Sequence, residues 1–182
     1  MVPVALDPTA LAMAVAGRGQ AASRRFRALR AGGAAELALF SDQPEALGAA
    51  AGEALRPWLP RHEDLQRVRV LWVAGLPRAC AANLADMARA QHVLVNVEDR
   101  PELCDFHSVA EVRRGDLLLT VSTGGASPGL AARIRARLAG EFGAEWGDRL
   151  DALRQHRRAW RAQGCDVAAL TDALLQANGW LT

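Results

Sequence analysis

Short apolar runs alternate with longer stretches rich in Ala, Arg and Leu along most of this chain of 182 residues. The runs are nearly continuous in apolar residues, which is typical of strands that are covered on both faces of a sheet. Alternation of such runs with helical patterns predicts β-α-β units and a parallel sheet. The runs expected to form strands are residues 11–16, 36–40, 68–74, 92–97 and 116–122.

A different pattern begins after Ser127. Proline is favoured in the first turn of a helix, so we expect a helix from Pro128 through Leu138. Everything after Glu141 has a helical pattern. Breaks in that pattern are expected near Gly143, Gly147 and Gly164. The chain is therefore predicted to be a Rossmann-like α/β part followed by a helical part.

A glycine-rich turn of the form G-x-G-x-x-G/A follows the first expected strand and opens a helix expected at residues 21–30. In dinucleotide-binding folds these positions permit a tight turn, close approach of a pyrophosphate and close packing of helix on strand. The start of the helix offers free N–H groups and the positive end of its dipole to the phosphates. A glycine-rich turn without a ligand is the alternative. The residues predicted to bind the cofactor here are Gly17, Arg18, Gly19, Gln20 and Ala21.

An acidic residue, Asp42, follows the second expected strand. Its distance beyond the glycines is the one at which a carboxylate holds the ribose 2′-hydroxyl of the cofactor. This position predicts NAD rather than NADP. Because Ser41-Asp42-Gln43-Pro44 is also a favourable turn sequence, a purely structural aspartate is the alternative.

More specific motifs lie between residues 93 and 138. In order, they are Asn96-Val97-Glu98-Asp99, Phe106, Arg114-Gly115-Asp116-Leu117, Ser122-Thr123-Gly124-Gly125-Ala126-Ser127-Pro128 and an arginine-rich helix. In this order and spacing they resemble the sirohaem synthase N-terminal family, whose members carry N-V-x-D, R-G-x-L and S-[ST]-G-G-x-S-P segments. The resemblance covers residues 1–140 and is thin across residues 43–90.

The resemblance implies a homodimeric enzyme that uses NAD to oxidise the tetrapyrrole precorrin-2 to sirohydrochlorin. In some members of the family the enzyme also inserts ferrous iron. The implied fold class is α/β, with a Rossmann-like NAD-binding domain over residues 1–106. A small dimerisation and active-site segment over residues 107–141 and a helical C-terminal domain over residues 142–182 follow it.

Asp99 is the predicted catalytic residue, because the family's chemistry is most closely tied to the carboxylate of the N-V-x-D segment. It follows the strand expected at residues 92–97, at the carboxyl edge of the sheet where α/β folds place ligands. A carboxylate there can accept a proton as carbon–carbon double bonds form, or remove pyrrole protons before a metal enters. A capping or turn aspartate before Arg100-Pro101 is the alternative.

Hydroxyls and backbone N–H groups gather around Thr123, the position that the family places at the active site. Such a turn can form an anion-binding concavity, and precorrin-2 carries several acetate and propionate arms. Arginines pair bidentately with carboxylates. The residues expected to bind the substrate are Ser122, Thr123, Gly124, Arg113, Arg114 and Arg133. For each arginine, a solvated surface position is the alternative.

Composition narrows the range of partners. A formal net charge of +2 is too small to predict nucleic acid as a partner.

The apolar run at residues 11–16 is too short to span a bilayer. The start of the chain also lacks the basic residues and the cleavage site of a signal peptide. A cytoplasmic protein without a membrane partner is therefore expected. The cysteines Cys80, Cys104 and Cys165 are widely spaced ordinary thiols, and no metal ligands are assigned.

Three positions depart from the family's pattern. Arg18 stands where a small residue is usual, so its side chain either swings outward or adds charge beside the pyrophosphate. Gly75-Leu76-Pro77 replaces the polar A-T-[DN] turn that usually follows the family's fourth strand, and Val109 replaces a proline. A non-catalytic nucleotide- or tetrapyrrole-binding module on the same fold is therefore the alternative to an enzyme.

Overall fold

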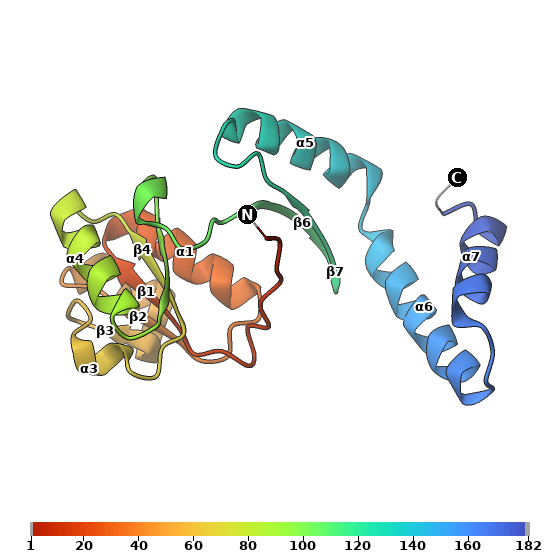
Figure 1. The fold of residues 1–182 in the computed structure, drawn as a ribbon, viewed down its shortest axis with the longest axis horizontal. Coiled ribbons are helices and arrows are strands. Elements are labelled where there is room, and N and C mark those ends of the chain that lie inside the picture. Colours follow the sequence, from red (N-terminus) through yellow and green to blue (C-terminus); the bar gives the residue numbers. More distant parts are fainter. Residues whose placement is uncertain (1, 181–182) are drawn as a thin grey trace. The chain divides into compact units, whose positions relative to one another are not determined.

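The computed structural model describes residues 2–180, which are drawn in Figure 1. The chain forms two compact units, of which unit 1 ends at Ser108 and unit 2 begins at Val109. Each unit has its own sheet and its own helices. No helix among residues 2–180 combines the length and the apolar composition needed to cross a bilayer.

Unit 1 is built on a parallel sheet of five strands in the order β3-β2-β1-β4-β5. Four strands coincide with predicted apolar runs, which confirms the predicted α/β fold class. Strand β3 (Leu55–Arg56) is an addition, because its two residues carry no apolar run by which the sequence could indicate it. The four predicted strands are β1 (Met13–Gly17), β2 (Leu37–Phe40), β4 (Val70–Ala74) and β5 (Leu94–Val97).

Two long helices cover opposite faces of this sheet. Residues Ala14 and Ala16 of β1 pack in one apolar core together with the buried face of α4 (Arg78–Arg89). Met13 and Val15 pack in a second core with the buried face of α1 (Gly19–Ala31). Every residue of β1 is buried, because alternate side chains enter different cores; this explains why the run is continuously apolar.

The remaining helices of unit 1 are short. Helix α2 (Gly48–Ala51) lies between β2 and β3, and α3 (His62–Leu65) lies between β3 and β4. The order of the strands reverses at β1, since β2 lies on one side of it and β4 on the other. Parallel α/β sheets bind ligands at the carboxyl ends of the strands beside such a reversal.

Unit 2 begins with an antiparallel hairpin of β6 (Ala110–Arg114) and β7 (Leu117–Val121). The strand predicted at residues 116–122 is therefore present as β7. The prediction that it belongs to the parallel sheet is wrong, because it pairs with β6 in a separate sheet of two strands. The two intervening residues, Gly115 and Asp116, fold β7 back onto β6. A two-residue connection of this kind permits only antiparallel pairing, since a parallel neighbour needs a long crossover.

Three helices follow the hairpin: α5 (Pro128–Glu141), α6 (Glu145–Ala162) and α7 (Val167–Ala177). The expected breaks near Gly143 and Gly164 are confirmed, but the break near Gly147 is wrong, because that residue lies inside α6. A single glycine weakens a helix by only about 1 kcal/mol, which the rest of an 18-residue helix tolerates.

Few side chains are buried within unit 2. The buried residues in its described part are Val112, Ala131 and Trp146. On α5, the apolar side chains of Leu130 and Ile134 are 51% and 38% exposed. Unit 2 therefore has a much smaller apolar core than unit 1.

Candidate functional site

The end of β1 lies directly against the end of β4, and this contact requires a glycine at position 17. A Cβ on Gly17 would collide with the carbonyl oxygen of Ala74 and lie 3.0 Å from the Cβ of Ala22. The amide of Arg18 donates a hydrogen bond to the same Ala74 carbonyl, at 3.1 Å. The first glycine and the small third residue of the fingerprint thus allow strand, turn and helix to pack closely, as the motif predicts.

The side of the turn at Gly19 is open. Gly19 has a φ of +58°, and apart from its chain neighbours and the backbone of its own helix no heavy atom lies within 4 Å of where its Cβ would be. The first turn of α1 contains no acidic residue, and the amides of Gly19, Gln20 and Ala21 find no acceptor among residues 2–180. Free N–H groups beside open space at a helix N-terminus fit the pyrophosphate of a dinucleotide.

The loop after β4 forms the other wall of this turn. Gly75 has a φ of +69°, and a Cβ there would lie 2.5 Å from the carbonyl oxygen of Arg18 and 3.4 Å from the Cβ of Ala21. The departure at Gly75-Leu76-Pro77 therefore has a steric reason, because only glycine lets this loop approach the turn so closely. Leu76 is buried against the core on the α4 side, 8% exposed.

A hollow of about 380 Å³ opens at this edge of the sheet. It lies beyond the carboxyl ends of β1, β4 and β5, next to the reversal of strand order. Two guanidinium groups and two carboxylates contribute to its wall, so the hollow is polar. Its lining includes Ala21 and Arg24 of α1, Gly75 after β4, and Glu98, Asp99 and Arg100 after β5.

Asp99, the predicted catalytic residue, lines this hollow with a carboxylate that makes no hydrogen bond or ion pair to the described residues. Its φ is +59°, a left-handed conformation that Asp and Asn tolerate better than most residues. The short 3-10 helix that follows at Pro101–Leu103 begins without a side-chain cap. Asp99 therefore does not cap this helix, and the alternative that it is a capping aspartate is wrong.

Cys104 supports the turn that carries Asp99. The amide of Val97 donates to its Sγ atom at 3.2 Å, and the thiol in turn faces the carbonyl oxygens of Val97 and Arg100, each at 3.2 Å. The sequence prediction that this is an ordinary thiol missed this role. No spacing rule indicates it, because the contacts depend on how the six intervening residues turn.

The residues after Cys104 form further hydrogen bonds with β5. The carboxylate of Asp105 accepts a hydrogen bond from the amide of Val95 at 2.9 Å, and it is itself bound by Arg89 at 2.8 Å. The side-chain amide of Asn96 donates to the carbonyl of Phe106 at 2.8 Å. These contacts give the N-V-x-D segment and the following residues one connected hydrogen-bond network.

The side chain of Arg18 swings outward and binds Asp42. Its Nε atom donates to Oδ1 at 2.7 Å and its Nη2 atom donates to Oδ2 at 2.6 Å. This hydrogen bonding holds the pKa of the Asp42 carboxyl below its ordinary value and raises the pKa of Arg18. In the neighbouring turn it is the Ser41 hydroxyl, not Asp42, that accepts the amide hydrogen of Gln43.

The predicted substrate residues all lie in unit 2, where the loop after β7 brings three of them together. The Thr123 hydroxyl bonds with the amide and the carbonyl of Ser127, at 3.2 and 3.1 Å. The Ser122 hydroxyl accepts a hydrogen bond from the amide of Gly124 at 3.3 Å. Ser127 caps α5 through the amide of Leu130. The loop is thus held in shape by its own hydroxyls.

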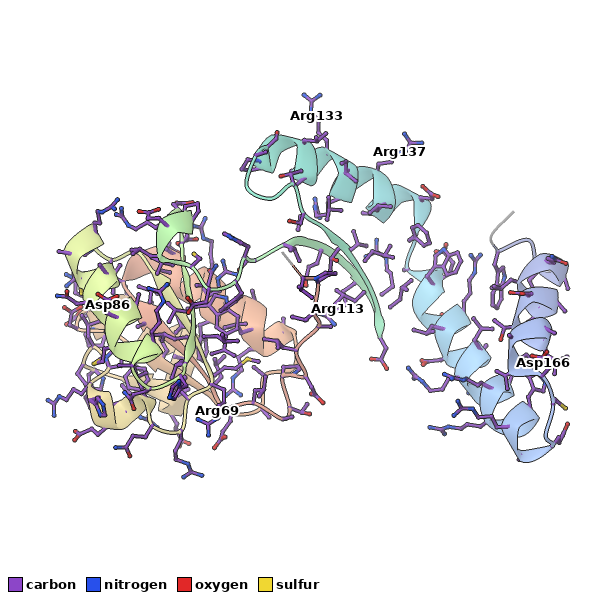
Figure 2. The ribbon with its side chains drawn as sticks, viewed as in Figure 1. Arg69, Asp86, Arg113, Arg133, Arg137 and Asp166 are labelled. Atoms are coloured by element: carbon purple, nitrogen blue, oxygen red, sulfur yellow. The ribbon has the colours of Figure 1, made fainter. Side chains whose placement is uncertain are left out.

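The three predicted arginines have different surroundings. Arg114 donates to the carbonyl oxygens of Phe142 and Ala139, at 2.9 and 3.1 Å, and so stabilises the end of α5. These contacts favour a structural role for Arg114. Arg113 lies 3.6 Å from the carboxylate of Glu111. Figure 2 shows Arg133 projecting outward from α5, and it forms no ion pair with the described residues.

No group of three or more His, Cys, Asp or Glu side chains that could hold a metal ion occurs among residues 2–180. The three cysteines are free, with Cys165 exposed and the other two partly buried.

Comparison with known proteins matches two family models. The model described as "Putative NAD(P)-binding" matches residues 4–110, and the model described as "Sirohaem biosynthesis protein central" matches residues 114–141. The first covers more than half of the chain. The boundary between the two matches lies close to the boundary between units 1 and 2.

Curated relatives include two siroheme synthases. The protein from Methylococcus capsulatus is 34% identical over 140 residues, which is 75% of this chain and 30% of that protein. The protein from Thiobacillus denitrificans is 34% identical over 170 residues, which is 87% of this chain and 33% of that protein. The chain thus spans about a third of the length of these relatives.

Among solved structures, the chain is similar to SirC, a precorrin-2 dehydrogenase. The TM-score is 0.67 with 24% sequence identity, and the match covers 87% of this chain and 79% of that one. This likeness shows that the two chains share a fold.

Proposed function

The chain belongs to the NAD(P)-binding family of sirohaem biosynthesis, and on this basis we propose that it oxidises precorrin-2 to sirohydrochlorin with NAD as the hydride acceptor. The observation that carries the proposal is the position of Asp99. Its carboxylate, unpaired among residues 2–180, lines the hollow at the carboxyl edge of the sheet, beside the turn formed by Gly17, Arg18 and Gly19.

The open turn fits the cofactor. The free amides of Gly19, Gln20 and Ala21 would hold the pyrophosphate, while Gly17 and Gly75 keep the surrounding backbone compact. Asp42 lies after β2, where the ribose would be held. When bound there, NAD supplies the site that accepts a hydride ion from the substrate.

Asp99 completes the oxidation by taking a proton. Converting a carbon–carbon single bond to a double bond removes one hydride and one proton, so the protein must provide a base for the proton. In the part of the chain that the structure describes, the carboxylate of Asp99 has no partner to displace before it acts. The left-handed turn, held by Cys104, keeps it at the mouth of the hollow.

Unit 2 would hold the carboxylate arms of the tetrapyrrole. We assign this role to Ser122, Thr123 and Gly124 in the loop after β7, with Arg113 and Arg133 as cationic partners. Arg114 acts indirectly, because its hydrogen bonds fix the end of α5 on the hairpin.

A homodimer is part of this proposal. Unit 2 has few buried side chains, and Leu130 and Ile134 on α5 are left partly exposed. Exposed apolar side chains beside a small core are typical of an interface. We assign the interface to residues 107–141. The location that we propose for the reaction is the cytoplasm, as expected from the sequence.

Insertion of ferrous iron into sirohydrochlorin is a second candidate activity. The feature that favours it is again the free carboxylate of Asp99, which suits removal of pyrrole protons. Iron would enter as a substrate of this step. Formation of sirohaem from purified sirohydrochlorin and ferrous iron, with the Asp99→Asn variant as control, tests this activity separately.

The dehydrogenase proposal is tested by an anaerobic assay of the purified protein with precorrin-2 and NAD, following NADH and sirohydrochlorin together. We expect one NADH for each sirohydrochlorin formed, and loss of both in the Asp99→Asn variant. Tight binding of NAD without turnover of competent precorrin-2 would contradict the proposal and favour a non-catalytic binding module.

A further inference from the structure

A bidentate ion pair occupies the position that selects between NAD and NADP in dinucleotide-binding folds. Asp42 lies after β2, and Arg18 lies between Gly17, the last residue of β1, and Gly19, the first residue of α1. These strands are parallel neighbours, so both residues lie at the same edge of the sheet. Two hydrogen bonds of 2.7 and 2.6 Å join the two side chains.

The ion pair with Arg18 weakens the preference for NAD over NADP that Asp42 would otherwise confer. A carboxylate at this position favours NAD because it accepts hydrogen bonds from ribose hydroxyls and repels the 2′-phosphate of NADP. Here each oxygen of Asp42 already accepts a hydrogen bond from Arg18, whose charge compensates its own. The repulsion that would exclude a phosphate is therefore weakened.

Arg18 has the capacity to bind that phosphate. A guanidinium group carries five N–H donors, and Asp42 uses only the one on Nε and one on Nη2. The other donors have no partner among residues 2–180. Phosphate is a preferred bidentate partner of arginine.

The geometry also allows the side chain to move. The side chains of Arg18 and Asp42 are 27% and 38% exposed, so solvent and ligand can reach both. The backbone of Arg18 is fixed by its hydrogen bond to Ala74 and by the close contact with Gly75. Only the flexible part of the side chain would have to reorient.

We propose that Arg18 and Asp42 together allow this chain to bind NADP as well as NAD, with Arg18 contacting the 2′-phosphate. This inference rests on the dinucleotide site of the proposed function. Asp42 retains the pair when NAD binds, and Arg18 turns to the phosphate when NADP binds.

The test is a calorimetric titration of the purified protein with NAD and, separately, with NADP. We expect dissociation constants that differ by less than about tenfold. The Arg18→Ala variant should lose about tenfold or more in affinity for NADP, as expected for a lost hydrogen bond between charged groups, and its affinity for NAD should fall far less. The Asp42→Asn variant should bind NADP more tightly.

Arg61→Ala is the matched control, since Arg61 also precedes a helix and pairs with an acidic side chain, Glu63, but lies away from the hollow. Its affinities should equal those of the unaltered chain. Exclusion of NADP by more than about a hundredfold, or equal losses for both cofactors in Arg18→Ala, would overturn the inference. A folded protein that binds neither cofactor would instead refute the proposed function.

Discussion

Two hydrogen-bond contacts join Cys104 to Val97: the Val97 amide donates to the sulfur, and the thiol faces the Val97 carbonyl, each at 3.2 Å. The thiol also reaches the carbonyl of Arg100, so it ties the two ends of the turn around Asp99. A residue outside the hollow thereby fixes the backbone of the residue to which we assign the chemistry.

Replacing Cys104 with alanine should therefore affect both stability and catalysis. We expect a loss of about 1–3 kcal/mol in the free energy of unfolding, because the Val97 amide loses its partner. The catalytic rate should fall more than the affinity for NAD, since the Asp99 turn loosens while the glycine turn is untouched. Urea denaturation and steady-state kinetics measure these changes. Cys165→Ala, at an exposed cysteine, should be neutral in both; equal effects would contradict the role of Cys104.

Substitutions of Asp99 and His92 separate the effect of a left-handed backbone from the effect of losing a catalytic carboxylate. Both have a φ of +59°, but His92 lies at the amino end of β5 and Asp99 at its carboxyl end. Asp99→Asn should keep the fold, because Asn tolerates this conformation, and should lower kcat by about 10²–10⁴-fold. His92→Asn should leave kcat unchanged. Retention of activity in Asp99→Asn would remove the assigned base.

Gly75→Ala should destabilise the chain and weaken cofactor binding. The added Cβ would lie 2.5 Å from the Arg18 carbonyl at a φ of +69°, so strain of about 1–3 kcal/mol or more is expected. Gly48→Ala is the control, since Gly48 lies in α2 with no heavy atom near its Cβ position. That change should be neutral or stabilising by about 0.4–1 kcal/mol. Thermal melts and NAD titrations of both variants test the contrast.

The ion pair of Arg18 and Asp42 predicts a pH dependence of stability. Arg18 lowers the pKa of Asp42 in the folded chain, so near that pKa the unfolded chain binds more protons than the folded one. The stabilisation is fully present above the ordinary aspartate pKa of about 3.9 and is lost as the pH falls through the lowered value. The difference in melting temperature between the unaltered chain and Asp42→Asn should thus shrink below about pH 4. A difference that stays constant down to pH 2 would be contrary to this linkage.

Arg114 and Arg133 should behave differently when each is replaced with alanine. Arg114→Ala removes hydrogen bonds to two carbonyl groups at the end of α5, so the melting temperature should fall. Arg133→Ala removes a surface charge that has no ion-pair partner among the described residues, so stability should be unchanged while KM for precorrin-2 rises. Circular dichroism melts and steady-state kinetics distinguish the two. An unchanged melt for Arg114→Ala would argue against its structural role.

The parallel strands could be predicted because a strand buried on both faces leaves a continuous apolar run, as in β1 and β4. Strand β3 could not, since a two-residue edge strand leaves no pattern. The sheet to which β7 belongs depends on its pairing partner, β6. Strand β6 could not be predicted, because its charged residues Glu111, Arg113 and Arg114 interrupt any apolar run.

The glycine turn and the position of Asp99 could be predicted from motif and strand order. The engagement of Arg18 with Asp42 could not, because two residues 24 positions apart meet only when their strands pair. The same holds for Cys104, whose partners are set by a backbone turn. Motifs thus indicate which residues lie at the carboxyl edge of the sheet more readily than which side chains bind one another.

All five strands of unit 1 run parallel, so the two edges of the sheet at their ends can serve different purposes when the protein is immobilised. The hollow lies at their carboxyl ends, while the connections that enter the strands lie at the opposite edge. Gln66 and Arg67, both exposed and just before β4, belong to that opposite edge. An attachment point for immobilisation on a biosensor surface can be introduced there, leaving the edge that carries the hollow facing the solution.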